Sequence, residues 1–371
     1  MTLDSYPGSW CEIHLDRISR NLKLALGLMP SGRKICAVLK ADAYGHGIAR
    51  VVPLMQAQGV TCIGITSNAE ACAVRNAGFD GTIIRVRAAT PDEIENGLEA
   101  RIEEQVSSLV IAEKLSALKV AGYEVRAHLA LNALGMSRDG LEISTDEGRS
   151  ICRSILNLLA GDIVGICTHF PCNLPENLRD SAKLFQDHVS WVFENSTLER
   201  SRILVHAGSS LTLISDELVE TDMYRCGAIL YGILKPELGF QTSMVLKTRV
   251  VSIGDYPKGA FVGYDRASRL DKDRKLACLS IGYANGFRRT TGTNSAVVLG
   301  GSNAPLLGKI SMNVLVVDIT DIDGIQIEDE AIVFGGIEDT KASLAATEQQ
   351  FCTIMADLYA DWGMRNARIF V

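Results

Sequence analysis

The chain has little that would mark it as fibrous, disordered or dominated by linkers. Its 371 residues include 9 Pro and 33 Gly, and 47% of the residues are hydrophobic. This composition excludes a collagen-like chain and a disordered acidic chain. Internal repeats and low-complexity segments are also lacking. The length predicts two domains, or one barrel of about 250 residues with a second unit attached.

The chain also lacks a strong excess of either charge. It carries 37 basic and 44 acidic side chains, for a net charge of −7. A nucleic-acid partner would need a face rich in Lys and Arg to neutralise phosphates, and the sequence has no such stripe. We therefore expect no nucleic-acid partner.

No apolar run approaches the roughly 20 residues of a membrane-spanning helix. The opening residues, Met1 to Gly8, lack a basic region followed by an apolar one. We therefore expect no membrane association and a cytoplasmic location. A trimmed export signal would make the location periplasmic instead.

The ten cysteines form no Cys-x-x-Cys pair, and most of them lie inside apolar runs. This pattern is typical of buried, reduced thiols rather than of a zinc site or a disulfide framework. We therefore expect no metal site, and a reducing compartment agrees with the cytoplasmic location.

Short apolar runs alternate with helical stretches from residue 12 to residue 232. Lys34–Leu39, Thr82–Val86 and Ile163–Thr168 are predicted strands, whereas Ile48–Ala57 and Asp146–Leu159 are predicted helices. About eight such units fit an α/β fold with a closed (β/α)8 barrel better than an open doubly wound sheet. No Gly-x-Gly-x-x-Gly follows the first strand, which further weakens a dinucleotide-binding alternative.

Beyond Gly232 the pattern changes to short strands separated by turn signals such as Asn285-Gly286 and Asp323-Gly324. Helical spacing is confined to Ser343–Leu358. This pattern of short strands and turns predicts a mostly β C-terminal domain. The predicted boundaries are 1–238 for the barrel and 239–371 for the β domain, and residues up to about residue 10 can join the β domain instead.

The most informative segment is Lys40-Ala-Asp-Ala-Tyr-Gly-His-Gly47, at the end of an apolar run. A (β/α)8 barrel places its active site at the carboxyl ends of its strands. Low-dielectric surroundings there would depress the pKa of Lys40 and make its amine a nucleophile for a carbonyl. A lysine considered alone more often extends from a strand end into water.

This segment resembles the lysine motif of alanine racemases and their relatives, which are pyridoxal-phosphate (PLP) enzymes with a barrel followed by a β domain. The resemblance covers essentially the whole chain and returns in seven further segments: Leu131–Arg138, Cys167–Phe170, His206–Ser210, Met223–Gly232, Val262–Tyr264, Ile281–Gly286 and Ser311–Asn313. The Met-Ser-Arg and Thr-His-Phe-Pro runs and the Leu358–Gly363 ending look closer to the broad-specificity amino-acid racemases than to dedicated alanine racemases.

The resemblance implies that Lys40 carries PLP and that Arg225 faces the pyridine nitrogen. A guanidinium does not release its proton, so it would leave this nitrogen unprotonated and the ring a weaker electron sink. A weaker sink favours racemisation over transamination. Phosphate binding would need neutral donors and close backbone approach, and the resemblance assigns it to Tyr44, Ser210, Gly227 and Ala228.

Three further residues of the barrel receive roles from the resemblance. Arg138 would lie near the cofactor's phenolic oxygen and the substrate carboxylate, where a planar guanidinium can address two oxygens. His169 and His206 would stand beside the ring and Arg225. A histidine considered alone is more often a satisfied core residue.

Racemisation needs one base on each face of the substrate Cα. The resemblance gives one face to Lys40 and the other to Tyr264 of the partner subunit, so the active form would be a homodimer. Tyrosine has a reference pKa of about 10 and needs neighbouring cations to act as a base. Considered alone, Tyr264 is a strand-end aromatic with its hydroxyl in water. Tyr283 and Met312 would line the same side and the access path, although Met312 is nearly as well explained as core filler.

Two positions depart from the family pattern. Many alanine racemases carry a lysine, often carbamylated, seven residues before the arginine of the Gly-Met-x-Arg segment, where this chain has Leu131. Another group must therefore hold Arg138, and Asn132 is the obvious neighbour. The family's C-terminal active-site tyrosine aligns with Met364. Methionine is unbranched and can change rotamer, so a substrate pocket bounded by Met364 would admit substrate side chains longer than a methyl group.

The resemblance predicts a homodimeric racemase of L and D amino acids, with alanine and serine as first substrates and lysine and arginine as longer ones. Two alternatives stay open. A PLP-dependent amino-acid decarboxylase on a related barrel would be expected to carry a carboxylate where Arg225 stands. A non-catalytic PLP carrier is made from a lone barrel, and the long segment after Gly232 argues against it.

Overall fold

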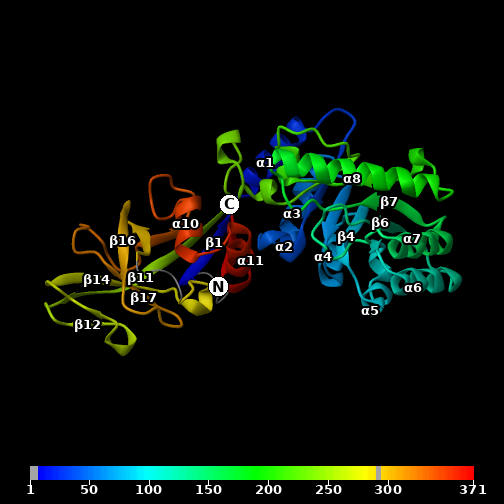
Figure 1. Ribbon diagram of the computed structural model, residues 1–371. Coiled ribbons are helices and arrows are strands. Elements are labelled where there is room, and N and C mark those ends of the chain that lie inside the picture. The colour runs from blue at the N-terminus through cyan, green and yellow to red at the C-terminus, as the bar shows by residue number, and fades with distance from the viewer. Residues whose placement is uncertain (1–6, 290–293) are drawn as a thin grey trace. The chain divides into compact units, whose positions relative to one another are not determined.

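The computed structural model describes residues 7–289 and 294–371. The chain divides into two compact units (Figure 1). The first, the barrel unit, contains Leu22–Ala43 and Ile48–Leu230. The second, the β unit, contains the described residues up to Asn21 together with Tyr44–Gly47 and Tyr231–Val371. Among the described residues, no helix combines the length and the apolar character needed to cross a membrane.

The barrel unit contains a sheet of nine parallel strands in the order β8-β7-β6-β5-β4-β3-β2-β10-β9. The strands are β2 (Lys34–Val38), β3 (Cys62–Ile65), β4 (Thr82–Ala88), β5 (Ile102–Val106), β6 (Ala127–Ala130), β7 (Ile163–Cys167), β8 (Leu204–His206), β9 (Gly208–Ser209) and β10 (Met223–Cys226).

The two ends of this sheet meet at one interrupted strand. Only Ala207 separates β8 from β9, and β8 pairs with β7 whereas β9 pairs with β10. Counting β8 and β9 as one strand gives eight strands in a nearly closed parallel barrel. The predicted (β/α)8 fold is therefore confirmed.

Helices alternate with the barrel strands, as the sequence pattern predicts. They are α1 (Leu15–Leu28), α2 (Lys40–Tyr44), α3 (Ile48–Ala57), α4 (Asn68–Asn76), α5 (Pro91–Glu95), α6 (Leu109–Val120), α7 (Asp146–Leu159), α8 (Pro175–Glu194) and α9 (Ser210–Leu213), with short 3₁₀ turns η1 (Leu98–Ala100), η2 (Arg200–Arg202) and η3 (Ala228–Tyr231). Side-chain caps define where several of these helices begin. Ser67 and Glu70 form a capping box at α4, and Thr90 and Glu93 form another at α5.

The apolar core of the barrel unit lies mainly between the strands and the helices. Leu118, Leu156 and Phe185 are buried there with residues of β6 and β7. A smaller cluster contains Cys36 and Cys62 together with Ile84 and Met223. Six of the ten cysteines are buried, as expected of small apolar side chains.

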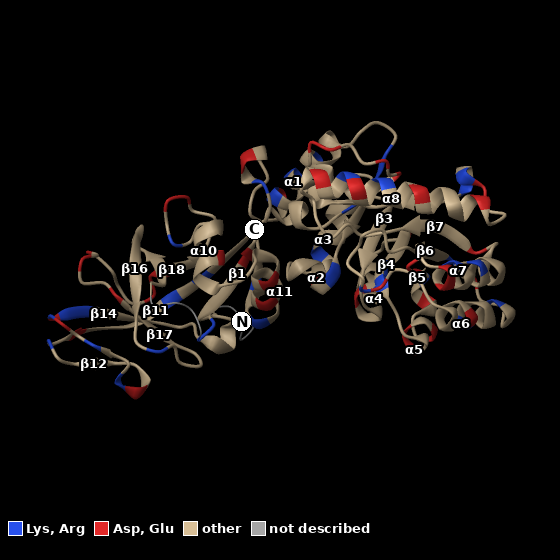
Figure 2. Ribbon diagram, viewed as in Figure 1, with Lys and Arg blue, Asp and Glu red and all other residues tan. Residues whose placement is uncertain are grey.

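Charged side chains of both signs are spread over both units (Figure 2). On α8, for example, Arg179 and Lys183 alternate with Asp180 and Asp187. This mixture matches the small net charge of the sequence.

The β unit contains an eight-stranded sheet in the order β14-β17-β16-β15-β18-β11-β1-β19, with a further pairing of β14 with β11. The strands are β1 (Ser9–Ile13), β11 (Met244–Tyr256), β14 (Arg274–Leu279), β15 (Ala296–Leu299), β16 (Ser302–Leu307), β17 (Leu315–Asp318), β18 (Glu330–Phe334) and β19 (Ala367–Phe370), and a separate ribbon joins β12 (Phe261–Val262) to β13 (Ser268–Arg269).

The long strand β11 closes this sheet on itself. Its first half pairs with β1 and β18. From Val250 onward it pairs with β14, with a register shift between Val250 and Ser252. Pairing therefore runs in a circuit through six strands from β14 back to β14. The mostly β character predicted beyond Gly232 is confirmed.

The prediction of one helical stretch over Ser343–Leu358 needs a correction. The structure has two helices, α10 (Leu344–Phe351) and α11 (Met355–Arg365). Cys352 separates them with a φ of 52°, a left-handed conformation that ends a helix. Fully buried Trp362 anchors α11 against the rings of Phe334 and Phe351.

Candidate active site

Lys40 is followed by a rare left-handed turn. Ala41, Asp42 and Ala43 have φ values of 53°, 51° and 57°. For residues other than glycine this conformation costs about 1–2 kcal/mol each, so neighbouring groups must hold it. The Ala41 N–H donates to Glu70 Oε1 at 2.7 Å, and the Ile48 N–H donates to Asp42 Oδ1 at 2.7 Å.

Lys40 begins this turn two residues after the carboxyl end of β2. The surrounding protein removes water from its ammonium group and thereby lowers its pKa, and the charge of Arg138 lowers the pKa further. A lowered pKa increases the fraction of neutral, nucleophilic amine near pH 7. Lys40 as a whole is solvent-exposed, so its role as the amine nucleophile stays a prediction.

Arg225 is buried in β10 and uses its guanidinium nitrogens on backbone carbonyls and imidazoles. Nη1 donates to His206 Nδ1 at 2.8 Å and to the His206 carbonyl at 2.9 Å, and Nη2 donates to the Thr168 carbonyl at 2.6 Å. Among the described residues no carboxylate forms an ion pair with Arg225. The group is thus oriented rigidly by neutral acceptors.

His169 follows β7, and its Nδ1 lies 3.5 Å from Arg225 Nη2. Burial and the charges of Arg225, Arg138 and Lys40 lower the pKa of His169 to about 4. The imidazole is therefore neutral at pH 7. These pKa effects also show that Lys40, Arg138, His169 and Arg225 lie close together, although they are far apart in the sequence.

Neutral donors lie at the carboxyl ends of β9 and β10. The Gly227 N–H donates to the Ser210 hydroxyl oxygen at 3.1 Å, and the Ser210 side chain also hydrogen-bonds the Cys226 thiol. Ala228 begins η3 directly after Gly227. Tyr44 belongs to the β unit, where its buried ring lies 4.8 Å from the ring of Tyr231.

Asn132 does not hold Arg138 in the way the sequence suggested. Its amide nitrogen donates to Glu142 Oε2 at 2.7 Å, and its Oδ1 accepts from the Ser137 N–H at 3.2 Å. Arg138 instead contacts Asp139 at 3.3 Å. Both ends of the Asn132 amide are thus hydrogen-bonded within the loop that carries Arg138. Asn132 therefore holds this loop and does not bond Arg138 itself.

In the β unit, hydrogen bonds between two loops bring Tyr283 and Met312 together. The Tyr283 N–H donates to the Ser311 carbonyl at 3.1 Å, and the Ala284 N–H donates to the Met312 carbonyl at 2.9 Å. A Cβ at Gly282 would lie 2.3 Å from the Ser311 oxygen, so only glycine permits this approach.

Tyr264 and Met364 are exposed in the β unit. Tyr264 is 61% exposed and begins the 3₁₀ turn η5 (Tyr264–Arg266), and the Arg289 guanidinium lies 5.8 Å from its ring centroid. Met364 lies near the end of α11 and is 73% exposed. Met312 is 54% exposed, which argues against the core-filler interpretation.

Family models account for nearly all of the chain. The alanine racemase N-terminal domain matches residues 13–235, and the alanine racemase C-terminal domain matches residues 243–370. The chain belongs to the alanine racemase family. The resemblance carried by the Lys40 segment is thereby confirmed.

Several relatives within this family are named for broad or basic specificity. The chain is 37% identical over 364 residues to a broad specificity amino-acid racemase of Vibrio parahaemolyticus, covering 98% of this chain and 89% of the relative. It is 35% identical over 364 residues to a lysine racemase of Proteus mirabilis, with the same two coverages.

Solved structures of alanine racemases share the fold. The alanine racemase of Clostridium difficile 630 superposes with a TM-score of 0.89 and 25% identity, covering 99% of this chain and 96% of that one. The alanine racemase of Bacillus anthracis has a TM-score of 0.89 at 23% identity, with coverages of 99% and 95%, and supports the fold alone.

Sequence reasoning missed one histidine of this alanine racemase family member. His128 Nδ1 lies 2.9 Å from His206 Nε2, on the side of His206 away from Arg225. The available signal was a polar residue inside the apolar run Ala127-His-Leu-Ala130. A fully buried polar side chain in a barrel strand indicates a hydrogen-bonded network.

Proposed function

We propose that this protein is a PLP-dependent racemase that interconverts the L and D enantiomers of amino acids. The observation that carries the proposal is the cluster of Lys40, Arg138, His169 and Arg225 at the carboxyl ends of the barrel strands. Its membership in the alanine racemase family and the names of its relatives support the same reaction class.

The donors of this cluster fit PLP. A lysine with a lowered pKa suits the aldehyde, and a guanidinium suits an unprotonated pyridine nitrogen because it can only donate. We assign the phosphate to the Ser210 hydroxyl, the backbone at Gly227 and Ala228, and Tyr44. Binding it would redirect the Gly227 N–H from the Ser210 hydroxyl oxygen. When bound, PLP supplies the electron sink that stabilises negative charge at the substrate Cα.

Each residue of the barrel unit then has a defined task. Lys40 Nζ takes or returns the proton on one face of Cα. Arg225 would face the pyridine nitrogen and, because it keeps its own proton, would limit the strength of the electron sink that PLP supplies. Arg138 orients the substrate carboxylate through a planar guanidinium. His169 and His206 stay neutral and position the ring and Arg225.

We assign the opposite face of Cα to Tyr264 of the partner subunit. In one chain Tyr264 and Met312 are both strongly exposed, as residues of an interface are before their partner binds. Arg289 near the Tyr264 ring supplies the neighbouring cation that a tyrosine base requires. Tyr283 and Met312 would line the access path on the same side.

Alanine and serine are the first substrates we expect, and lysine and arginine are the longer ones. Met364, in place of the family's bulky tyrosine, leaves an unbranched and adaptable wall. The names of the relatives, broad specificity amino-acid racemase and lysine racemase, point in the same direction.

One experiment separates racemase, decarboxylase and carrier. Purified protein is incubated with PLP and L-alanine, and chiral analysis is run beside a carbon dioxide assay. We expect D-alanine without carbon dioxide. In the Lys40→Ala variant, racemisation and covalent fixation of the cofactor by borohydride should both be lost. Normal turnover by this variant would refute the assignment of Lys40.

The homodimer is tested by complementation. Neither a Lys40→Ala homodimer nor a Tyr264→Phe homodimer has a complete site, but a hybrid of the two contains one intact site. Mixing under conditions of subunit exchange should therefore restore activity. No recovery, once mass spectrometry has shown the hybrid, would place Tyr264 in its own subunit's site or outside the chemistry.

A further inference from the structure

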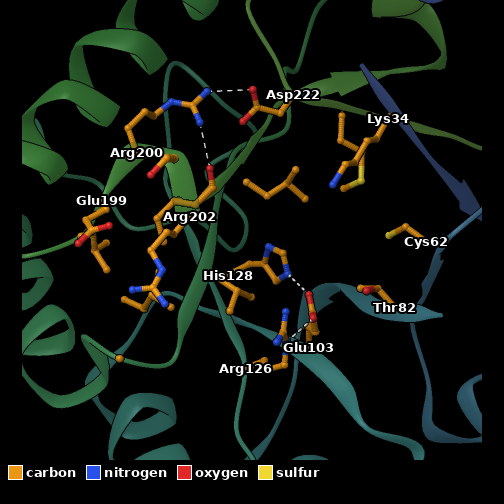
Figure 3. Close-up of a pocket in the computed structure, with 18 of the residues that line it drawn as sticks. Lys34, Cys62, Thr82, Glu103, Arg126, His128, Glu199, Arg200, Arg202 and Asp222 are labelled. Atoms are coloured by element: carbon orange, nitrogen blue, oxygen red, sulfur yellow. Dashed lines mark hydrogen bonds and ion pairs between the residues drawn. The ribbon is translucent and has the colours of Figure 1, made fainter. Parts of the chain in front are cut away.

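A cavity of about 840 Å³ lies at the end of the barrel opposite to Lys40. Six of its lining residues are the first residues of barrel strands: Lys34, Cys62, Thr82, Ile163, Leu204 and Met223. Lys40, Arg138 and His169 instead follow strand ends. Glu103 and His128 also line the cavity and, like Arg126, appear in Figure 3.

A continuous chain of hydrogen bonds connects this cavity with Arg225. His128 Nε2 lies 2.8 Å from Glu103 Oε2, His128 Nδ1 lies 2.9 Å from His206 Nε2, and His206 Nδ1 lies 2.8 Å from Arg225 Nη1. Both imidazoles are fully buried. These three contacts give each of the four ring nitrogens one hydrogen-bond partner, so no ring nitrogen needs water as a partner.

The direction of every bond in this relay is fixed by chemistry. A guanidinium can only donate, so His206 Nδ1 must accept and the single proton of neutral His206 must be on Nε2. That proton is donated to His128 Nδ1, which places the His128 proton on Nε2. His128 then donates to the Glu103 carboxylate, which accepts only.

The hydrogen-bonded chain ends at Glu103, which supplies a carboxylate. Arg225 itself forms no ion pair with a carboxylate of the described residues. Arg126 Nε donates to Glu103 Oε1 at 2.6 Å, so both oxygens of Glu103 accept from this network. Burial opposes ionisation of Glu103, but the bond from His128 and the charge of Arg126 prevail and lower its pKa. Figure 3 shows His128 and Arg126 converging on this carboxylate.

A glycine in the neighbouring strand β7 makes room for the His128 ring. A Cβ at Gly165, in β7, would lie 2.0 Å from His128 Nδ1. Glycine at this position therefore gives the imidazole the space between β6 and β7 that the two hydrogen bonds require.

We propose that Glu103 and His128 are positioning residues, which hold Arg225 through His206 by fixing the tautomers of both imidazoles. They act from the amino-terminal cavity and touch neither substrate nor cofactor. The inference rests on the role proposed above for Arg225. In metal sites, removing the partner on the second nitrogen of a ligating imidazole typically costs about 10–100-fold in affinity or activity, and we expect an effect of the same order here.

The first test needs no turnover. The full-length protein is labelled with ¹⁵N-histidine, and long-range ¹⁵N–¹H correlation spectra report which nitrogen of each ring carries the proton. The chain has 6 histidines, so single substitutions can assign the signals. We expect His206 and His128 to be neutral Nε2–H tautomers. A doubly protonated ring or an Nδ1–H tautomer at either position would overturn the proposal.

The second test compares substitutions at two neighbouring glutamates. Glu103→Leu removes the acceptor of His128, whereas Glu103→Gln keeps an acceptor oxygen in place. Glu104→Leu is the matched control, because Glu104 is equally buried but bonds Arg85 at 2.7 and 2.9 Å instead of the relay. The readouts are the His206 ¹⁵N shifts, and kcat and KM for alanine.

We expect Glu103→Leu to change the His206 ¹⁵N shifts and to lower kcat by about 10–100-fold with KM nearly unchanged. Glu103→Gln should restore the tautomers. Glu104→Leu removes the partner of buried Arg85 and should lower stability, but it should leave the His206 ¹⁵N shifts unchanged. Unchanged shifts and turnover in Glu103→Leu would refute the relay while leaving the racemase proposal intact. Expected shifts in a protein that racemises none of alanine, serine, lysine and arginine would refute the racemase proposal alone.

Discussion

Replacing Gly165 with alanine should place a methyl group inside the His128 ring. A Cβ at Gly165 would lie 2.0 Å from His128 Nδ1 and 2.6 Å from Cε1. The ring is fully buried, and its two nitrogens are held by His206 at 2.9 Å and by Glu103 at 2.8 Å. It therefore has no direction of escape that keeps both hydrogen bonds.

Two costs combine in Gly165→Ala. Overpacking a core costs about 1–3 kcal/mol. Displacing the ring also leaves the His206 Nε2–H or the Glu103 carboxylate without its buried partner, which costs about 1–3 kcal/mol more. We therefore expect the free energy of unfolding to fall by roughly 2–6 kcal/mol. Turnover should also fall, because a displaced His128 no longer fixes His206.

Gly161→Ala is the matched control. Gly161 lies just before the same strand, and a Cβ there would meet only Lys119 Nζ, at 3.8 Å. Urea unfolding of both variants, followed by circular dichroism, gives the stability difference, and racemisation of L-alanine gives kcat. If Gly165→Ala unfolds at the same urea concentration as the control and keeps its kcat, the packing argument is wrong.

Three further predictions concern Tyr264, Met364 and Glu93. Tyr264→Phe should slow inversion of D-alanine by about 10²–10⁴-fold while Lys40 still exchanges its α-hydrogen with solvent. Equal loss of exchange from both enantiomers in NMR would contradict separate bases. Met364→Tyr should lower kcat/KM for lysine relative to alanine by about 10–200-fold, measured across a substrate panel. Strict alanine specificity of the unmodified enzyme would show that another wall closes the pocket. The hydrogen bond from Arg87 and the Thr90 backbone hold the pKa of Glu93 at about 2, below its usual range. This depressed pKa stabilises the fold above about pH 4.3, the reference value for Glu, and the contribution is lost as the pH falls toward 2. Glu93→Gln should thus cost about 1 kcal/mol in urea unfolding at pH 7 and little near pH 2, since the pair is partly solvent-screened. A pH-independent difference would refute the assignment.

Most of the barrel could be predicted from the sequence because its strands are short, apolar and regularly followed by helices. The predicted strand Ile163–Thr168 is β7 almost without change, and the predicted helix Asp146–Leu159 is α7. The position of the Lys40 segment could also be predicted, because its motif is contiguous in the sequence and follows the strand β2. Local pattern suffices where each residue's environment is set by its neighbours in the chain.

The strand β5 escaped the sequence analysis because its residues look like a surface segment. Ile102-Glu-Glu-Gln-Val106 contains two carboxylates, yet Glu103 and Glu104 are both buried. Each is paired with cations or imidazoles of other strands, which makes burial of the charge possible. Hydrophobicity alone does not reveal such a strand.

The sequence by itself determined the fold class and the family, and it singled out Lys40, Arg138, His169 and Arg225 as candidate site residues. Only the tertiary structure decided how Arg225 is held. Its relay joins Glu103 to His128, His128 to His206 and His206 to Arg225 across 25, 78 and 19 residues of sequence. These partners meet because barrel closure brings the inner faces of β5, β6, β8 and β10 together. The left-handed turn after Lys40 is also a tertiary effect, because its conformation is unfavourable for alanine and depends on Glu70 from α4.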